Sequence, residues 1–120
     1  MNCVQLLVDT ATRLPEKTAL VFRNEETSYK DLVNQIFKFA NGLRENGIKE
    51  NMHVGILMGN SPQYIISYYA LLSIGATVVP LNPQYREKEL AYILNNADAV
   101  ALICLLNIVK QILTVHGISF

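Results

Sequence analysis

The residues that come nearest to a phosphate-binding loop lie between Gly42 and Lys49. Gly42 and Gly47 have the spacing of a Walker A loop, but Ile48 occupies the position of the lysine that contacts the phosphates. Such a loop also leaves a strand and begins a helix, so that its amides and the helix dipole face the anion. Here the glycines lie within and just after an expected helix. Helix termination therefore explains this segment better than nucleotide binding.

Histidines and carboxylates do not form a recognisable metal or acid–base site. His53 and His116 have no second ligand at helical or hairpin spacing, so we expect surface or packing roles rather than metal ligation. Asp31, Glu87 and Glu89 lie near expected helix starts, where the helix dipole favours negative charge. Acid–base catalysis would need a partner group at a matching distance. We expect these three carboxylates to stabilise helix ends.

Cysteines and tyrosines also have structural explanations. Cys3 and Cys104 match neither a CxxC motif nor a zinc spacing, so idle or buried thiols in a reducing compartment are expected. Tyr64, Tyr68 and Tyr69 lie on one apolar helical segment, where core packing explains them more simply than ligand stacking.

The segment Gly55-Ile-Leu-Met-Gly59 matches neither a dinucleotide fingerprint nor a membrane GxxxG seam, and we expect close packing against a neighbouring backbone. With the other candidates explained structurally, we predict that this chain contains no catalytic, cofactor-binding or metal-binding residue.

Composition limits the classes of partner. The chain has 120 residues, of which 51% are hydrophobic and 17% charged, and ten Lys and Arg balance ten Asp and Glu. This is less charged than the usual globular mix of about a quarter, which indicates apolar surface that a partner covers; self-association is one expected form of this. A zero net charge without a basic run gives no electrostatic case for nucleic acid or an anionic membrane.

Targeting and membrane signals are not evident. The first residues lack a basic region followed by a continuous apolar stretch, so no signal peptide is expected. The longest apolar stretch, residues 99–109, is shorter than the roughly 18 residues of a membrane span, and Asn107 interrupts it. We expect no transmembrane segment and a cytoplasmic location.

Helices and strands are expected to alternate along the chain. Helical periodicity and capping residues predict helices over about residues 4–14, 28–46, 62–74 and 86–94, and apolar runs predict strands at 19–22, 53–58, 76–80 and 99–104. Residues 24–26 are expected to form a turn. This order predicts an α/β fold with a mainly parallel sheet and helices packed on its faces.

Four segments in unbroken order resemble the adenylate-forming, or AMP-binding, superfamily. Residues 27–32, followed by Gly42-Leu43 and Asn46-Gly47, are similar to its "T-Y-x-E-L … L … G" opening. Residues 54–62 resemble its "V-a-i-l-l-x-N-s-P" block. Residues 72–83 resemble its "L-K-x-G-a-x-x-V-P-l-n-P" signature, and residues 89–94 its "E-L-x-y-i-L" helix. Within this superfamily, the sequence of residues 59–85 is most similar to that of bacterial long-chain fatty-acid–CoA ligases.

The resemblance implies an incomplete N-terminal portion of the large domain of such an enzyme. Family members join a carboxylic acid to ATP, with magnesium, to give an acyl-adenylate, and coenzyme A then displaces AMP. The resemblance implies ATP, magnesium, coenzyme A and a fatty acid for the full-length enzyme. The Gly-rich Ser/Thr loop and the other catalytic segments of the family cannot be placed here, so we expect an inactive scaffold fragment.

Residues 1–104 form the expected subregion of an acyl-CoA synthetase domain, and residues 105–120 match no family block. This tail could be a divergent helix, a frameshifted or prematurely stopped end, or a cut end, and we favour a truncated frame or fragment. Two other functions remain open: a stand-alone interaction or regulatory module on the same scaffold, and an unrelated small nucleotide-binding α/β domain, which the missing glycine loop disfavours.

Overall fold

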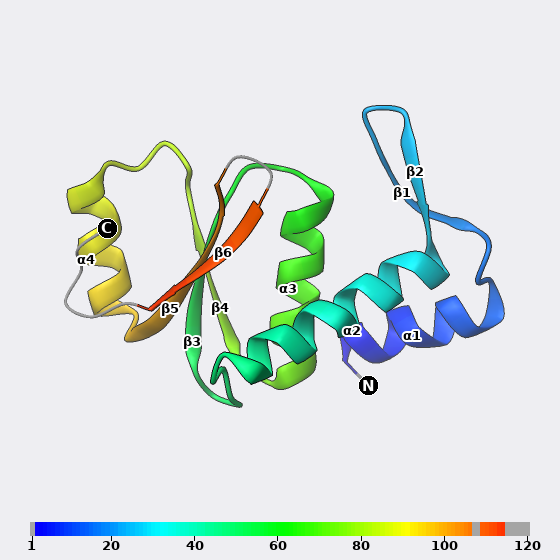
Figure 1. The fold of residues 1–120 in the computed structure, drawn as a ribbon, viewed down its shortest axis with the longest axis horizontal. Coiled ribbons are helices and arrows are strands. Elements are labelled where there is room, and N and C mark those ends of the chain that lie inside the picture. The colour runs from blue at the N-terminus through cyan, green and yellow to red at the C-terminus, as the bar shows by residue number, and fades with distance from the viewer. Residues whose placement is uncertain (1, 107–108, 115–120) are drawn as a thin grey trace.

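The chain folds into a four-stranded sheet with helices on both faces and a separate two-stranded hairpin beside them (Figure 1). The computed structural model describes residues 2–106 and 109–114, with side chains described as far as Cys104. In chain order the elements are α1 (Cys3–Arg13), β1 (Thr18–Phe22), β2 (Glu25–Ser28), α2 (Tyr29–Glu45), β3 (His53–Leu57), α3 (Pro62–Ile74), β4 (Thr77–Leu81), α4 (Glu87–Asn96), β5 (Ala99–Leu106) and β6 (Val109–Thr114).

The main sheet has the strand order β4-β3-β5-β6, with β3 parallel to both of its neighbours. Leu57 at the carboxyl end of β3 therefore lies opposite Leu81 of β4 and Cys104 of β5. Strand β6 pairs with β5 in the antiparallel direction. The expected α/β fold with a mainly parallel sheet is confirmed.

Apolar side chains alternate along the strands and form a separate core on each face of the sheet. On one face, Val54 and Ile56 of β3 and Ile103 of β5 belong to a large cluster that also includes residues of α2 and α3. Figure 1 shows α3 beside the sheet, with α2 and α1 farther from it. The opposite face has a smaller core, covered by α4: Leu81, Leu90, Leu94 and Leu102.

Local signals set most helix ends. The N–H of Asp31 donates to Ser28 Oγ at the start of α2, and the N–H of Tyr64 donates to Ser61 Oγ at the start of α3, each over 3.2 Å. Gly75 caps α3 with a φ of 86°, a left-handed conformation that glycine adopts without strain. Helix α1 has a cap that the sequence interpretation missed, the side chain of Asn2.

The first hairpin corrects one expectation. Residues 24–26 were expected to form a turn, but Glu25–Ser28 is strand β2, and Phe22 pairs directly with Glu25. The two loop residues are Arg23 and Asn24, with φ of 51° and 67°. Positive φ at both positions is the type I′ geometry that matches strand twist. Arginine rarely occupies such a position, so the sequence did not indicate this turn.

The segment from residue 105 onward also differs in part from expectation. Strand β5 continues to Leu106, and Val109–Thr114 forms β6, so a helix is wrong for residues 109–114. The antiparallel pairing joins Leu106 to Val109 and Ala101 to Thr114. The division of the chain into a domain at 1–104 and a tail at 105–120 stays a prediction.

Candidate functional site

The segment that most resembled a phosphate loop is a helix end. Gly42 lies inside α2, and Gly47 follows the helix with a φ of 89°. The N–H of Gly47 donates to the carbonyl oxygen of Arg44, and the N–H of Ile48 donates to that of Leu43. These amides are used to close the helix and do not converge on a common point where an anion could sit. The expected helix termination is confirmed.

The three carboxylates lie where the sequence predicted, at the starts of helices, and do not meet. Asp31 is exposed in the first turn of α2, and Glu87 and Glu89 are exposed in the first turn of α4. Helices α2 and α4 lie on opposite sides of the sheet (Figure 1). The structure therefore does not bring these groups together into a pair that could share acid–base work.

His53 has a structural partner. Its Nδ1 donates a hydrogen bond of 2.6 Å to the carbonyl oxygen of Ala97, the C-terminal cap residue of α4. The bond ties the start of β3 to the end of α4, which is consistent with the expected packing role. His116, the other histidine considered as a ligand, lies outside the described residues.

Gly55 packs closely, but against side chains rather than the backbone that was expected. A Cβ at this position would lie 3.0 Å from Cδ1 of Leu81 and 3.0 Å from Cδ2 of Leu94. The missing side chain lets α4 approach the middle of the sheet. Gly59 differs, because a Cβ there would meet nothing within 4 Å, so close packing is wrong for this glycine.

The thiols and tyrosines fit the expected structural roles only in part. Cys3 is exposed, whereas Cys104 is half-buried and burial raises the pKa of its thiol. Tyr64 and Tyr69 are half-buried and pack against the large core. Tyr68 is exposed, and its ring stacks on that of Tyr64 with 6.2 Å between the ring centroids.

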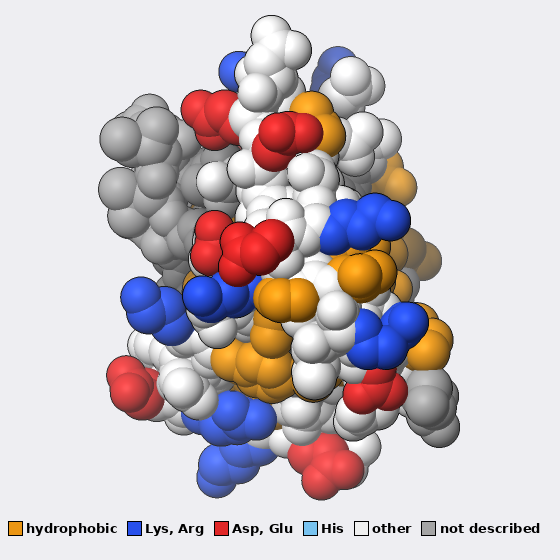
Figure 2. Space-filling model, turned by 90° about the vertical axis from the view of Figure 1, so that its right-hand side faces the viewer, with side chains coloured by type: hydrophobic (Ala, Val, Ile, Leu, Met, Phe, Trp, Pro, Cys, Tyr) orange, Lys and Arg blue, Asp and Glu red, His pale blue; other side chains and the backbone are white. Residues whose placement is uncertain are grey.

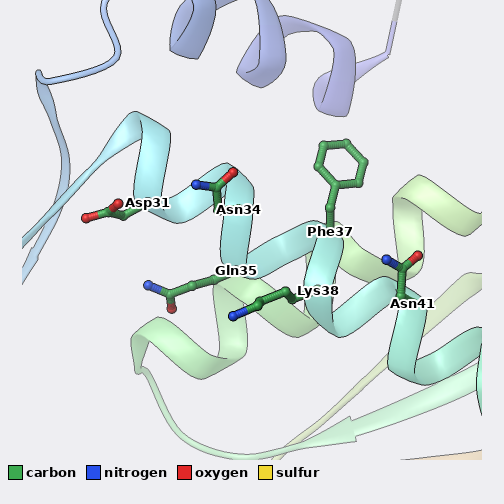
Figure 3. Close-up of a pocket in the computed structure, with 6 residues that line it drawn as sticks. All are labelled: Asp31, Asn34, Gln35, Phe37, Lys38 and Asn41. Atoms are coloured by element: carbon green, nitrogen blue, oxygen red, sulfur yellow. The ribbon is translucent and has the colours of Figure 1, made fainter.

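One surface hollow, of about 400 Å³, follows the outer face of α2. All of its lining residues come from this helix and all are exposed. Figure 3 shows Phe37 pointing toward α1, while the polar ends of Gln35 and Lys38 point away from it. A hollow lined by one helix leaves a ligand in contact with water, so it lacks the desolvation that strengthens polar recognition.

A second hollow, of about 200 Å³, lies between the β1–β2 hairpin and the start of α3. Ser61, which lines it, accepts from the N–H of Tyr64 and donates to the carbonyl oxygen of Gly59. No charged side chain lines this hollow among the residues that the structure describes. It therefore offers no charge to balance a phosphate group.

The described residues do not form a metal-binding cluster of their own. Within residues 2–106 and 109–114, no three His, Cys, Asp or Glu side chains gather where they could hold a metal ion. The prediction that this chain itself binds no cofactor or metal stays a prediction, since side chains beyond Cys104 are not described.

Within residues 2–106 and 109–114 there is also no helix that is long and apolar enough to cross a lipid bilayer.

Comparisons with known proteins match nearly the whole chain. The family model of AMP-binding enzymes matches residues 7–118, which extends beyond the limit of 104 expected from sequence. The long-chain-fatty-acid–CoA ligase of Bacillus subtilis (strain 168) is 38% identical over 100 residues, which cover 83% of this chain and 18% of that protein. Bacitracin synthase 3 of Bacillus licheniformis is 34% identical over 99 residues, covering 82% of this chain and 2% of the synthase.

Solved structures of adenylation enzymes also match this chain. The N-terminal subdomain of NpsA from Klebsiella oxytoca, in complex with 3-hydroxyanthranilyl-AMSN, superposes with a TM-score of 0.83 at 28% identity. The match covers 88% of this chain and 27% of that subdomain. The chain thus spans a small part of each relative's length. Sequence and fold agree that the chain belongs to the AMP-binding enzyme family.

Proposed function

We propose that this chain supplies framework to an enzyme that activates a carboxylic acid with ATP. In that reaction a carboxylate oxygen attacks the α-phosphate of ATP, pyrophosphate leaves, and an acyl-adenylate forms. The enzyme must hold two anions together and exclude water from a reactive mixed anhydride. The observation that carries the proposal is the match of the family model to residues 7–118, together with the superposition on an adenylation subdomain.

The finer proposal is a fatty-acid–CoA ligase, in which the thiol of coenzyme A displaces AMP from the adenylate. Its support is the 38% identity with the Bacillus subtilis ligase, against 34% with bacitracin synthase 3. A peptide-synthetase adenylation function is the second candidate, because that 4% difference in identity is small. The two differ in the acid activated, a fatty acid or an amino acid.

The role of the described residues is support rather than chemistry. Their capping groups and glycines hold helices and strands in place. The first hollow described above lacks the enclosure that an adenylate would need, and the second lacks the charge. We therefore propose that the chain alone is inactive. Residues 1–104 would contribute the scaffold, and the reacting groups would come from segments that correspond to other parts of the relatives.

A segment exchange tests the proposal. Residues 1–104 of this chain replace the N-terminal segment of the Bacillus subtilis ligase that ends at the residue matching Cys104, and the chimera is assayed for AMP and palmitoyl-CoA with ATP, coenzyme A and palmitate. We expect palmitoyl-CoA from the chimera and no AMP from the isolated chain with palmitate or with any of the twenty amino acids. A folded chimera without activity would contradict the scaffold role, and turnover by the isolated chain would contradict inactivity.

A further inference from the structure

The two faces of the main sheet are covered unequally. On one face α3 lies against the strands, and α2 and α1 add a second layer of helices beyond it (Figure 1). On the other face, among the described residues, α4 covers the strands through a core of four buried leucines. A helix in the interior of a large domain is packed on two sides, whereas residues 2–106 and 109–114 pack on only one side of α4.

The outer side of α4 bears the most exposed large hydrophobic side chain of the described residues. Tyr92 is 70% exposed, although a tyrosine ring contributes a large apolar area. Tyr85 and Ile93, both half-buried, lie beside it and line a mainly apolar hollow of about 490 Å³ together with Lys88 and Glu89. We define these five residues as the α4 face.

The opposite end of the molecule offers a less suitable surface. Leu6, Val21 and Phe37 are 54%, 62% and 39% exposed there, on α1, β1 and α2. Figure 2 shows the hydrophobic side chains of that end with Lys, Arg, Asp and Glu side chains spread around and between them. Such a mixture is typical of a solvated surface, where single exposed apolar residues need no partner.

The size of the relatives indicates which protein segment packs on the α4 face. This chain corresponds to 27% of the NpsA N-terminal subdomain, which was solved as a separate body. The other three-quarters of such a subdomain must pack on some surface of this part. In the part of the chain that the structure describes, the α4 side has one helix layer and an exposed apolar hollow, so we take it as the surface on which the next layer packs.

We propose that the α4 face is the internal interface on which the rest of an adenylate-forming subdomain packs, with Tyr92 as its central apolar contact. This inference rests on the proposed function. It assigns Tyr92 a role in joining the scaffold to the remainder of the enzyme, and it commits to that occupant rather than to a second copy of this chain.

The test places Tyr92 in two contexts, the full chain alone and the chimeric ligase. Hydroxyl-radical labelling, read by mass spectrometry, should modify Tyr92 strongly in the chain alone and severalfold less in the chimera, while Leu6 is labelled alike in both. Tyr92→Lys should leave the unfolding midpoint of the chain unchanged and lower that of the chimera. The matched control, Leu6→Lys, should change neither.

Each other outcome has a distinct meaning. Equal labelling of Tyr92 in the two contexts would overturn the interface, as would a loss of stability from Tyr92→Lys in the chain alone. Self-association of the chain that Tyr92→Lys abolishes would make a second copy the occupant and would also overturn it. An active chimera whose unfolding midpoint does not change with Tyr92→Lys would refute the interface alone. An inactive or unfolded chimera would refute the proposed function.

Discussion

Single residues decide how closely the layers of this fold approach one another. Gly55 in the central strand leaves room for Leu81 and Leu94, so the helix above it can reach the sheet. The sequence indicated a packing role for this glycine but not its partners, because which side chains meet is decided by tertiary structure. The roles of the polar residues at helix ends were more predictable, since capping acts locally within one turn.

Replacing Gly55 should therefore be costly. Gly55→Val adds a Cβ at 3.0 Å from two leucine methyl groups, and further methyls beyond it, so we expect a loss of about 1–3 kcal/mol in the free energy of unfolding. Urea unfolding followed by circular dichroism measures this. Gly42→Ala is the matched control: a Cβ there meets nothing within 4 Å in a helix, and a gain of about 0.5–1 kcal/mol is expected. Equal effects of both changes would contradict the close packing.

Ser67 is a buried polar residue without an evident function. Its side chain is 0% exposed, and its Oγ has no hydrogen-bond partner within the part of the chain that the structure describes. An unsatisfied buried hydroxyl costs free energy, so Ser67→Ala should stabilise the chain by about 1 kcal/mol. Thermal unfolding measures the change, with Ser73→Ala as a control that removes a hydroxyl bonded to the carbonyl oxygen of Ala70. A clear loss of stability at Ser67 would mean that its hydroxyl has a partner.

Burial of Cys104 should be visible in its reactivity. Burial raises the pKa of this thiol because it disfavours the thiolate, which is the nucleophile. Alkylation by iodoacetamide should therefore reach half its maximal rate at a higher pH in the folded chain than in urea. The unfolded state ionises first, so this group lowers folding stability as the pH rises from the unfolded toward the folded pKa. Coincident pH profiles in the two states would contradict the effect.

At the scale of elements, the starts and ends of helices were the most predictable features. Ser61, Pro62 and Gly75 predicted α3 from capping and backbone rules that act within one turn. The β1–β2 hairpin was less predictable, because Arg23 occupies a positive φ that arginine rarely adopts. Asn2 was also missed as a cap, since the helical pattern was first evident at Val4.

Helix α3 provides the test at this scale. Ser61→Ala removes the oxygen that accepts from the N–H of Tyr64, so we expect a loss of about 1 kcal/mol in unfolding free energy. Ser61→Asp retains an acceptor and adds charge complementary to the helix dipole, so it should keep most of the stability. Calorimetry of the three proteins measures the series. A loss in Ser61→Asp equal to that in Ser61→Ala would show that capping is not the cause.

At the scale of the whole molecule, the chain carries two unequal cores and a sheet with β4 at one edge. An uncovered edge and a thin layer of helix both reduce the apolar area that folding buries. The α/β fold followed from the alternation of elements, because that pattern allows few arrangements. The identity of the acid substrate did not follow, because capping, turn and strand patterns carry no information about the acid that an enzyme activates.

We expect the isolated chain to be marginally stable. Its urea midpoint should lie well below that of the Klebsiella oxytoca NpsA N-terminal subdomain, with a smaller dependence of free energy on urea because less surface becomes exposed. Light scattering should detect aggregation near that midpoint. A cooperative transition with a midpoint as high as that of the NpsA subdomain would show that the chain is self-sufficient.

The strand order has a consequence for synthesis on the ribosome. Strand β3 is made before β4 and β5 but lies between them, so a nascent chain cannot close the centre of the sheet until both later strands have left the exit tunnel. Before that point α1, the β1–β2 hairpin and α2 can assemble, while the N–H and C=O groups of the apolar strand β3 are still unpaired. During this interval a ribosome-associated chaperone would have the most apolar surface to shield.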